Sequence, residues 1–262
     1  MDNRPIGVFD SGLGGLTAVK ELLENMPQED IVYFGDTGRV PYGSRSQETL
    51  IKYAAQDIHF LEEKQVKMIV IACGTISSLV GRLKKPQDLP IIDVLYPTAL
   101  AASLATHNKR VGVIGTSTTI HSGSYRRVLA EIDPQIQVFD RDCPLFVPLV
   151  ESGFIEEDEP VTRLVAERYL GELRDAGVDT LIMGCTHYPI ISRIIGSIMG
   201  KGVTLINSGR ETAFCCRKQL EESGLLSGRT SKGQCSYYVS DRMADFSKIA
   251  GIFLGRDIGQ EV

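Results

Sequence analysis

The sequence predicts an α/β protein of two similar domains, each a mainly parallel sheet flanked by helices. Two observations favour this fold class. Apolar runs rich in β-branched residues alternate with amphipathic stretches along nearly the whole chain, which is typical of parallel sheets covered by helices on both faces. In addition, two pairs of short segments repeat between the halves of the chain, and the offsets of the two pairs nearly agree.

The expected strands are short apolar runs, which in chain order cover residues 6–9, 31–34, 68–72, 91–94, 111–114, 137–139, 181–183 and 203–206. Between them apolar residues recur at helical spacing, and we expect helices at residues 16–25, 48–64, 159–175 and 211–222. The end of the chain predicts a helix, a strand and a helix at 211–222, 235–239 and 244–254. This closing segment is too small to stand alone, so we expect it to return to the first domain.

The clearest repeat places a cysteine after a buried strand in each half. Residues 67–75 read KMIVIACGT, with Cys73 at the strand end, and residues 179–187 read DTLIMGCTH, with Cys185 at the same place. A second pair, IGVFDSG at 6–12 and VGVIGTS at 111–117, also marks two strand-to-loop junctions. Either pair alone could be two ordinary α/β strands, but the nearly common offset favours duplication.

Two domain boundaries follow from this repeat. One lies near Tyr96-Pro97, where a proline follows a strand and a helix of small residues begins, and the other lies near Asn207-Ser208-Gly209. We therefore expect a discontinuous first domain of residues 1–97 and 208–262, and a second domain of residues 98–207.

The composition is that of a globular protein without a basic surface. The chain has 262 residues, is 43% hydrophobic and carries a net charge of −5, so we expect no nucleic-acid partner. No apolar run is long enough to span a bilayer, and the amino terminus enters a strand-like run without a leader. We therefore expect a cytoplasmic protein that does not bind membranes. The six cysteines form no CxxC pair, so reduced thiols are expected.

The two repeated cysteines could act on one small molecule. Strand ends in open parallel sheets face the ligand crevice, so Cys73 and Cys185 could approach a carbon atom from opposite sides. A thiolate is a good base. If one thiolate removes a proton and the other thiol returns one to the opposite face, the carbon is inverted, and no cofactor is needed where the protein stabilises the carbanion. Asp10 and His187 are placed to exchange protons with the two thiols. Taken alone, a cysteine after a buried strand is more often a small core residue, but the paired positions favour the catalytic interpretation.

The glycine-rich loop at residues 10–17, DSGLGGLT, suits a carboxylate or a phosphate, because glycines let backbone N–H groups approach a ligand. A dinucleotide site is a weaker interpretation, since Thr17 stands at the third glycine position and Asp10 would repel a pyrophosphate. Asp36, which we place at the end of the second strand, would be the ribose-binding acid of such a site. The next loop, residues 35–44, offers the hydroxyls of Tyr42 and Ser44, although alone it is a simple strand-to-helix connection.

Two other classes of function remain open. Cys73, Cys185 and His187 could form a zinc site with an open fourth position, although no spacing within one segment supports it. Alternatively, two lobes could close on an acidic amino acid without catalysis, with the cysteines merely packed. Zinc analysis and deuterium incorporation at Cα distinguish these alternatives from the two-thiol reaction.

The motifs together resemble the glutamate racemases of the aspartate/glutamate racemase family. The resemblance runs in order from residue 6 to about residue 255 and rests on GVFDSGLGGL at 7–16, YFGDT at 33–37, VPYG at 40–43, Ala72-Cys73, GCTHYP at 184–189 and YVSD at 238–241. It implies a cofactor-independent racemase whose site lies in the cleft between the domains. It further implies a homodimer and a product, D-glutamate, that enters peptidoglycan.

The resemblance also implies roles for individual residues. Cys73, assisted by Asp10, would deprotonate D-glutamate, and Cys185, assisted by His187, would deprotonate L-glutamate. The matching substrate contacts are Asp10, Ser11, Tyr42, Gly43, Gly74, Thr75, Thr186 and His187, with Thr116 and Thr119 as weaker candidates. Asp36, Glu151 and Ser44 would lie behind these residues or be solvated.

One position departs from the family pattern. After the first cysteine the family commonly has Asn-Thr, whereas this chain has Gly74-Thr75. Glycine offers the substrate no amide, and one lost hydrogen bond costs on the order of 1 kcal/mol of binding. A racemase for both aspartate and glutamate is therefore an alternative to one for glutamate alone.

Overall fold

The computed structural model describes residues 1–241 and 246–256, apart from the side chain of Ser44. The chain forms two compact units. The first comprises Met1–Val94 and the chain from Gly209 onward, and the second comprises Leu95–Ser208. Every strand pair in the described part of the chain is parallel. The predicted fold class, parallel sheets flanked by helices, is therefore confirmed.

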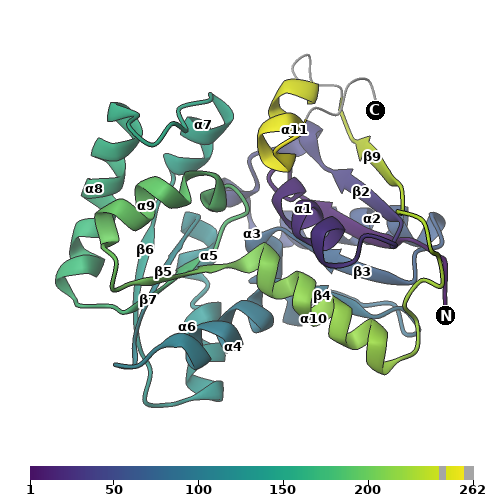
Figure 1. Ribbon diagram of the computed structural model, residues 1–262, viewed down its shortest axis with the longest axis horizontal. Helices are drawn as coiled ribbons and strands as arrows, with labels where there is room; N and C mark the ends of the chain where they lie inside the picture. The colour runs from purple at the N-terminus through teal and green to yellow at the C-terminus, as the bar shows by residue number, and fades with distance from the viewer. Residues whose placement is uncertain (242–245, 257–262) are drawn as a thin grey trace. The chain divides into compact units, whose positions relative to one another are not determined.

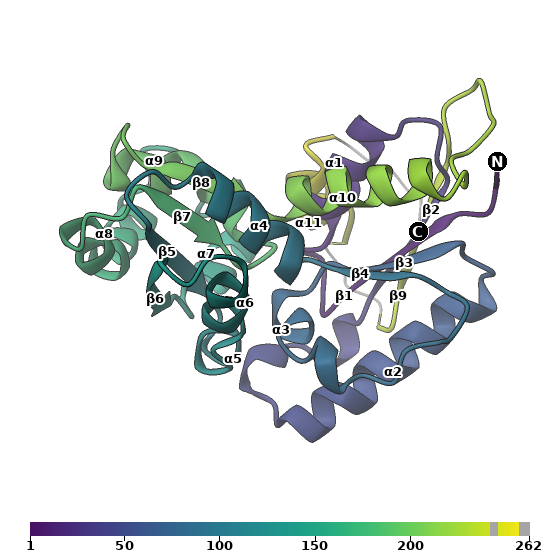
Figure 2. The same ribbon diagram turned by 90° about the horizontal axis from the view of Figure 1, so that it is seen from below.

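The first unit has a five-stranded sheet in the order β4-β3-β1-β2-β9. Its strands are β1 (Ile6–Asp10), β2 (Ile31–Gly35), β3 (Met68–Ile71), β4 (Ile91–Asp93) and β9 (Cys235–Val239). As Figure 2 shows, one face is covered by α1 (Leu16–Asn25) and α10 (Ser208–Glu222), and the other by α2 (Gln47–Glu63) and α3 (Gly74–Ser77). The remaining elements are α11 (Phe246–Leu254), which packs against α1, and the short 3-10 helices η1 (Thr37–Arg39), η2 (Tyr42–Ser44) and η3 (Val80–Arg82).

The second unit has a four-stranded sheet in the order β6-β5-β7-β8. Its strands are β5 (Arg110–Gly115), β6 (Gln137–Asp142), β7 (Thr180–Met183) and β8 (Thr204–Asn207). As Figure 1 shows, one face is covered by α4 (Leu95–Ala105) and α6 (Ser124–Ile132), and the other by α8 (Pro160–Asp175) and α9 (Ser192–Met199). The remaining elements are α5 (Ser117–His121), α7 (Phe146–Glu151) and the 3-10 helix η4 (Tyr188–Ile191).

The two sheets repeat one arrangement. Read in the same direction, β4-β3-β1-β2 corresponds to β8-β7-β5-β6, so β3 and β7 are equivalent strands beside the equivalent central strands β1 and β5. The register agrees, because Gly7 pairs with Ile69 in the first sheet and Gly112 pairs with Leu181 in the second.

The repeated glycines show why the sequence repeats there. A Cβ atom on Gly7 would lie 3.0 Å from a methyl of Val66, and one on Gly112 would lie 3.3 Å from a methyl of Val178. Val66 precedes β3 as Val178 precedes β7, so the same close packing recurs in both units. Both sequence repeats therefore mark equivalent places in the fold.

The structure corrects several details of the predicted elements. β2 ends at Gly35, so Asp36 lies just beyond the strand. β6 extends to Asp142 through three polar residues, which the apolar pattern did not indicate, because residues 140–142 still pair with β5. The short helices α3, α5, α6, α7 and α9 were not predicted, because each has at most nine residues. Of the last predicted helix, residues 244 and 245 lie outside the described residues.

Candidate active site

Each unit carries one thiol at the carboxyl end of its equivalent strand. Beyond β3, the amide of Ala72 donates to the carbonyl of Phe9 at 3.0 Å, and Cys73 follows. Beyond β7, the amide of Gly184 donates to the carbonyl of Ile114 at 2.8 Å, and Cys185 follows. The carboxyl ends of parallel strands are where ligands bind in open α/β sheets. Each unit thus presents a thiol at the ligand-binding edge of its own sheet.

Cys73 is buried in the first unit, with 4% of its surface exposed. Its Sγ atom lies 3.5 Å from the hydroxyl oxygen of Ser11, which accepts the thiol proton. Burial and the nearby charge of Asp10 raise the pKa of Cys73 to about 12. At neutral pH this cysteine is therefore a protonated thiol, ready to donate a proton, and Asp10 lies close enough to influence its charge.

Asp10 ends β1 and holds the glycine-rich loop that follows. One carboxylate oxygen accepts hydrogen bonds from the amides of Gly12 at 3.3 Å and Gly15 at 2.8 Å. A Cβ atom on Gly15 would lie only 2.5 Å from the Cβ of Asp10, so no other residue fits there. These two amides therefore fix the catalytic carboxylate candidate, whereas the sequence suggested that the loop amides would face a ligand.

Cys185 lies in a hydrogen-bonded chain with His187 and Glu151 in the second unit. The Sγ atom of Cys185 lies 3.9 Å from Nδ1 of His187, and the hydroxyl of Thr186 lies 3.3 Å from the same nitrogen. On the other side of the ring, Nε2 of His187 lies 3.0 Å from a carboxylate oxygen of Glu151, the last residue of α7. His187 thus bridges the thiol and the carboxylate.

These contacts set the charge of the imidazole. Burial lowers the pKa of His187, but the bonds and charges of Cys185 and Glu151 outweigh it and raise the pKa to about 10. His187 is therefore an imidazolium at neutral pH. The site thus holds a positive charge beside Cys185.

Other predicted contacts lie at the start of the helices that follow the strands. Cys73 precedes α3, whose first residues are Gly74 and Thr75, both buried. In the second unit, Thr116 caps α5 and its hydroxyl lies 3.0 Å from that of Thr119. The hydroxyls of Thr116 and Thr119 thus form a hydrogen bond with each other. Gly74 and Thr75, in contrast, directly follow Cys73 in the chain.

In the loop after β2, Asp36 is bound by two other side chains of the same loop. Asp36 is fully buried, and its carboxylate accepts a hydrogen bond from Tyr42 and forms an ion pair with Arg39 at 2.5 Å. Tyr42 opens η2, which contains Gly43 and ends at Ser44, whose side chain lies outside the described part of the structure.

Two members of this group, Arg39 and Asp57, were not predicted from the sequence. Arg39 donates to a carboxylate oxygen of Asp57 at 2.9 Å, and the other oxygen of Asp57 lies 3.2 Å from the Tyr42 hydroxyl. A signal for Asp57 exists in the sequence, because it falls on the apolar stripe of α2 between Ala54 and Leu61. A carboxyl on a buried helical face needs polar partners.

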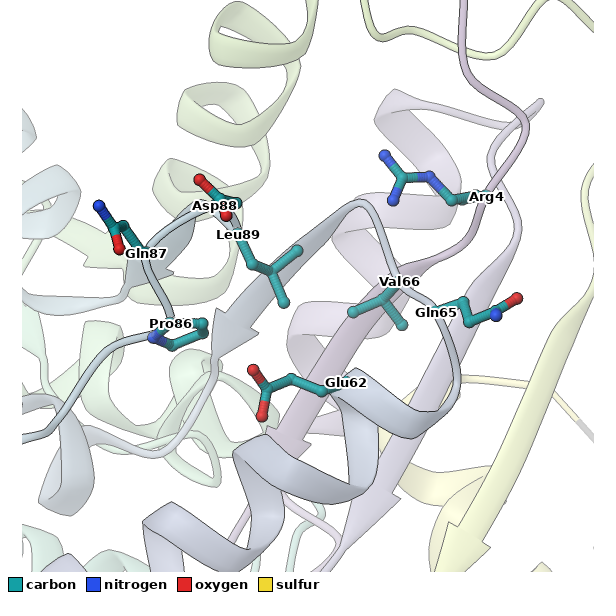
Figure 3. A pocket seen from close by; sticks show the side chains of 8 residues that line it. All are labelled: Arg4, Glu62, Gln65, Val66, Pro86, Gln87, Asp88 and Leu89. Atoms are coloured by element: carbon teal, nitrogen blue, oxygen red, sulfur yellow. The ribbon is translucent and has the colours of Figure 1, made fainter.

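A hollow of about 660 Å³ in the first unit lies at the opposite edge of the sheet (Figure 3). It is bordered by Arg4, before β1, and by Val66, before β3, so it adjoins the edge where these strands begin. The other side chains that line it are Glu62, Gln65, Pro86, Gln87, Asp88 and Leu89. Neither thiol contributes to this hollow.

Within the described ranges 1–241 and 246–256, no three His, Cys, Asp or Glu side chains are grouped so as to hold a metal ion. A search of the helices in the same ranges finds none with the length and apolar character needed to cross a bilayer.

Comparison with known proteins shows the family to which this chain belongs. A model of the Asp/Glu/hydantoin racemase family matches residues 10–214. Glutamate racemase from Geobacter metallireducens is 44% identical over 98% of this chain and 94% of its own length. The crystal structure of glutamate racemase from Francisella tularensis in complex with D-glutamate superposes with a TM-score of 0.89, at 40% identity over 98% of this chain and 96% of that one. A glutamate racemase isoform from Bacillus anthracis superposes at 0.93, with 34% identity over 99% of this chain and 97% of that one. The chain belongs to the Asp/Glu/hydantoin racemase family.

Proposed function

We propose that this protein interconverts L- and D-glutamate without a cofactor, with Cys73 and Cys185 acting on opposite faces of the substrate Cα atom. The observation that carries the proposal is the thiol at the end of each equivalent strand, one beside Asp10 and the other beside His187. The likeness to glutamate racemases, one of them solved with D-glutamate, supports the choice of substrate.

In the direction from L- to D-glutamate, the Cys185 thiolate removes the Cα proton. The electron pair of the broken C–H bond moves into the substrate carboxylate, and the Cys73 thiol then donates its proton to the opposite face of Cα. Cys185 ends as a thiol and Cys73 as a thiolate. The imidazolium of His187 lies beside Cys185, and the raised pKa of Cys73 favours the starting thiol.

The return of both thiols to their starting states needs proton exchange on each side. Asp10 beside Cys73 and His187 beside Cys185 are the groups that we assign to this exchange. The reverse reaction starts from the alternative state, in which the Cys73 thiolate removes the Cα proton of D-glutamate. Because Asp10 raises the pKa of Cys73, this thiolate is a strong base once formed.

We assign substrate binding to the polar groups at the starts of the loops. The proposed contacts are Asp10, Ser11, Tyr42, Gly43, Gly74, Thr75, Thr186 and His187, with Thr116 and Thr119 as secondary candidates. Gly74 lacks the amide that the family commonly has at this position, which favours weaker side-chain selectivity. Racemisation of aspartate as well as glutamate is therefore the second candidate function.

A circular dichroism assay of L- and D-glutamate and of L- and D-aspartate tests this proposal on the wild type, Cys73→Ser and Cys185→Ser. We expect the wild type to racemise glutamate and both variants to lose racemisation, because serine is a far weaker acid than cysteine. Racemisation at the wild-type rate in either variant contradicts the two-thiol mechanism. Binding of glutamate without deuterium incorporation at Cα would instead identify a binding protein.

The remaining parts of the proposal concern the setting of the reaction. The motif resemblance supports a cytoplasmic homodimer that supplies D-glutamate for peptidoglycan. Cell fractionation tests the location, and light scattering of the purified protein tests the dimer. Growth of a depleted strain with and without added D-glutamate tests the role in the cell wall.

A further inference from the structure

A single hydroxyl in the first unit faces two buried carboxyl groups. The Tyr42 hydroxyl contacts Asp36 and lies 3.2 Å from Asp57. All three residues are buried, with exposed fractions of 2%, 0% and 1% for Tyr42, Asp36 and Asp57. A hydroxyl has one proton and can donate to only one of the two carboxyl groups. For both contacts to be hydrogen bonds, one carboxyl group must carry a proton of its own.

The charges of Arg39, Asp36 and Asp57 also indicate that one of the two carboxyl groups carries a proton. Arg39 is the one cation that contacts the two carboxyl groups among the described residues, at 2.5 Å from Asp36 and 2.9 Å from Asp57. The second oxygen of Asp36 is buried and has no hydrogen-bond partner among the described residues. Two ionised carboxylates would thus leave one buried negative charge uncompensated, which is costly. One shared proton makes the group neutral.

The geometry assigns that proton to Asp57. Asp36 binds Arg39 and Tyr42 through one oxygen, as an ionised acceptor does. Asp57 uses its two oxygens differently, one accepting from Arg39 and the other facing Tyr42. Burial and the charge of Asp36 raise the pKa of Asp57 to about 8, against the opposing effect of Arg39. A protonated Asp57 then donates to the Tyr42 oxygen, and Tyr42 donates to Asp36.

We propose that Asp57, as a neutral carboxylic acid, and Arg39 are positioning residues that hold Tyr42 and Gly43 in the conformation that binds substrate. The inference rests on the proposed function, in which Tyr42 and Gly43 contact the substrate. Tyr42 and Cys73 belong to one buried apolar cluster, so the residues that hold Tyr42 pack in the same core as the thiol. The Arg39 guanidinium also lies 4.2 Å from the ring centre of Tyr53, which packs against Tyr42.

The groups that face Asp57 decide its pH response. They are Asp36 after β2, Arg39 on η1 and Tyr42 on η2, while Gln56 on α2 binds Arg39 from the side. Burial keeps the pKa of Tyr42 far above neutral and Arg39 stays protonated. As pH rises through about 8, Asp57 is thus the group that ionises. The ionised Asp57 no longer donates to Tyr42, so the loop that carries Tyr42 and Gly43 loses one of the hydrogen bonds that hold it.

Two variants of Asp57 test the proposal, with Glu63→Gln on the exposed face of α2 as the matched control. Asp57→Asn keeps the donor and the acceptor of a neutral acid, whereas Asp57→Leu removes both. We expect the KM for glutamate to stay close to that of the wild type in Asp57→Asn and to rise about tenfold in Asp57→Leu, with a smaller change in kcat. The wild-type KM should rise above about pH 8, and Asp57→Asn should lose this part of the rise.

A measurement without substrate separates this inference from the proposed function. A carboxyl group with a raised pKa binds its proton more tightly in the folded state, so folding stability falls as pH rises from the unfolded value of 3.8 to about 8. We expect the melting temperature of the wild type to fall relative to that of Asp57→Asn across this window. Glu63→Gln should follow the wild type.

The outcomes are distinct. If Asp57→Asn behaves like Asp57→Leu in KM, a charge is required and the proposal is wrong. A wild-type KM in Asp57→Leu also overturns it, and so does a melting curve of Asp57→Asn that follows the wild type at every pH. If Asp57→Leu does not fold, the KM and pH profile of Asp57→Asn decide. Failure of the wild type to racemise glutamate overturns the proposed function, while the melting comparison still tests the neutral Asp57.

Discussion

The Nε2 atom of His187 lies 3.0 Å from a carboxylate oxygen of Glu151. His187 is buried, whereas 44% of the Glu151 side chain is exposed. A half-exposed carboxylate thus helps to keep a buried imidazole charged beside Cys185. In the first unit, the equivalent thiol has a buried carboxylate, Asp10, as its neighbour instead. The two thiols therefore have different ionisable neighbours although their strands are equivalent.

Replacing Glu151 with glutamine should lower the pKa of His187, the imidazole beside Cys185. Glu151 contributes to the raised pKa of His187, which is about 10, so the imidazole loses its proton as pH rises through that value. Without the carboxylate this loss occurs at lower pH, and the cation beside Cys185 disappears earlier. Because the Glu151 side chain is partly exposed, its charge is screened, and we expect about a fivefold fall in kcat/KM near pH 8.

Racemisation rates of L- and D-glutamate against pH measure this effect. Two enantiomers are equal in energy, so kcat/KM must fall equally in both directions. Glu167→Gln is a suitable control, because Glu167 pairs with Arg174 on the exposed surface of the same unit. If the rate of Glu151→Gln falls at high pH along the same curve as that of the wild type, the role of Glu151 is contradicted.

Gly74→Asn should restore the amide that this chain lacks beside Cys73. Gly74 is the buried first residue of α3. One added hydrogen bond to the substrate is worth about 1 kcal/mol, so the KM for glutamate should fall about fivefold. The ratio of glutamate to aspartate turnover should rise with it. Gly81→Asn is the matched control, since a Cβ atom there meets nothing within 4 Å. Equal KM values in both variants would contradict a role for position 74 in selectivity.

Lys67→Met should destabilise the first unit. The Lys67 ammonium lies 2.5 Å from a carboxylate oxygen of Glu29, and the two side chains are 0% and 2% exposed. It also donates to the carbonyls of Asp2 at 2.7 Å and Leu225 at 2.9 Å. Lys67 thus joins the segments around residues 2, 67 and 225, which are distant in the sequence. Removing one partner leaves a buried charge, which costs about 3–5 kcal/mol. Urea unfolding measures the loss, and the exposed Lys218→Met should change the free energy of unfolding by less than about 0.5 kcal/mol.

Much of the fold could be predicted from the sequence because the sheets are parallel and buried. Strands such as β1 and β3 are continuous apolar runs, and long helices such as α1 show a clear period. The repeat around Gly7 and Gly112 was visible because a Cβ atom at either position would lie 3.0 Å or less from a neighbouring side chain.

The contacts of the site could be predicted less well. Glu151 precedes His187 by 36 residues, and their hydrogen bond depends on how α7 packs. Asp57 and Arg39 come from separate elements, and only the folded loop brings them to Tyr42. Local periodicity carries no information on such pairs. The resemblance to a family identified Cys73, Cys185 and their neighbours. It did not identify Asp57 and Arg39, which hold the loop at Tyr42.

Exchange of the Cα hydrogen in deuterium oxide tests the two-thiol account most directly. Cys73→Ala retains Cys185 and should exchange the Cα hydrogen of L-glutamate only, while Cys185→Ala retains Cys73 and should exchange that of D-glutamate only. Neither variant should racemise, because the thiol on the opposite face is missing. Exchange of the same enantiomer by both variants, or inversion at the wild-type rate in either, would contradict the assignment of one thiol to each face.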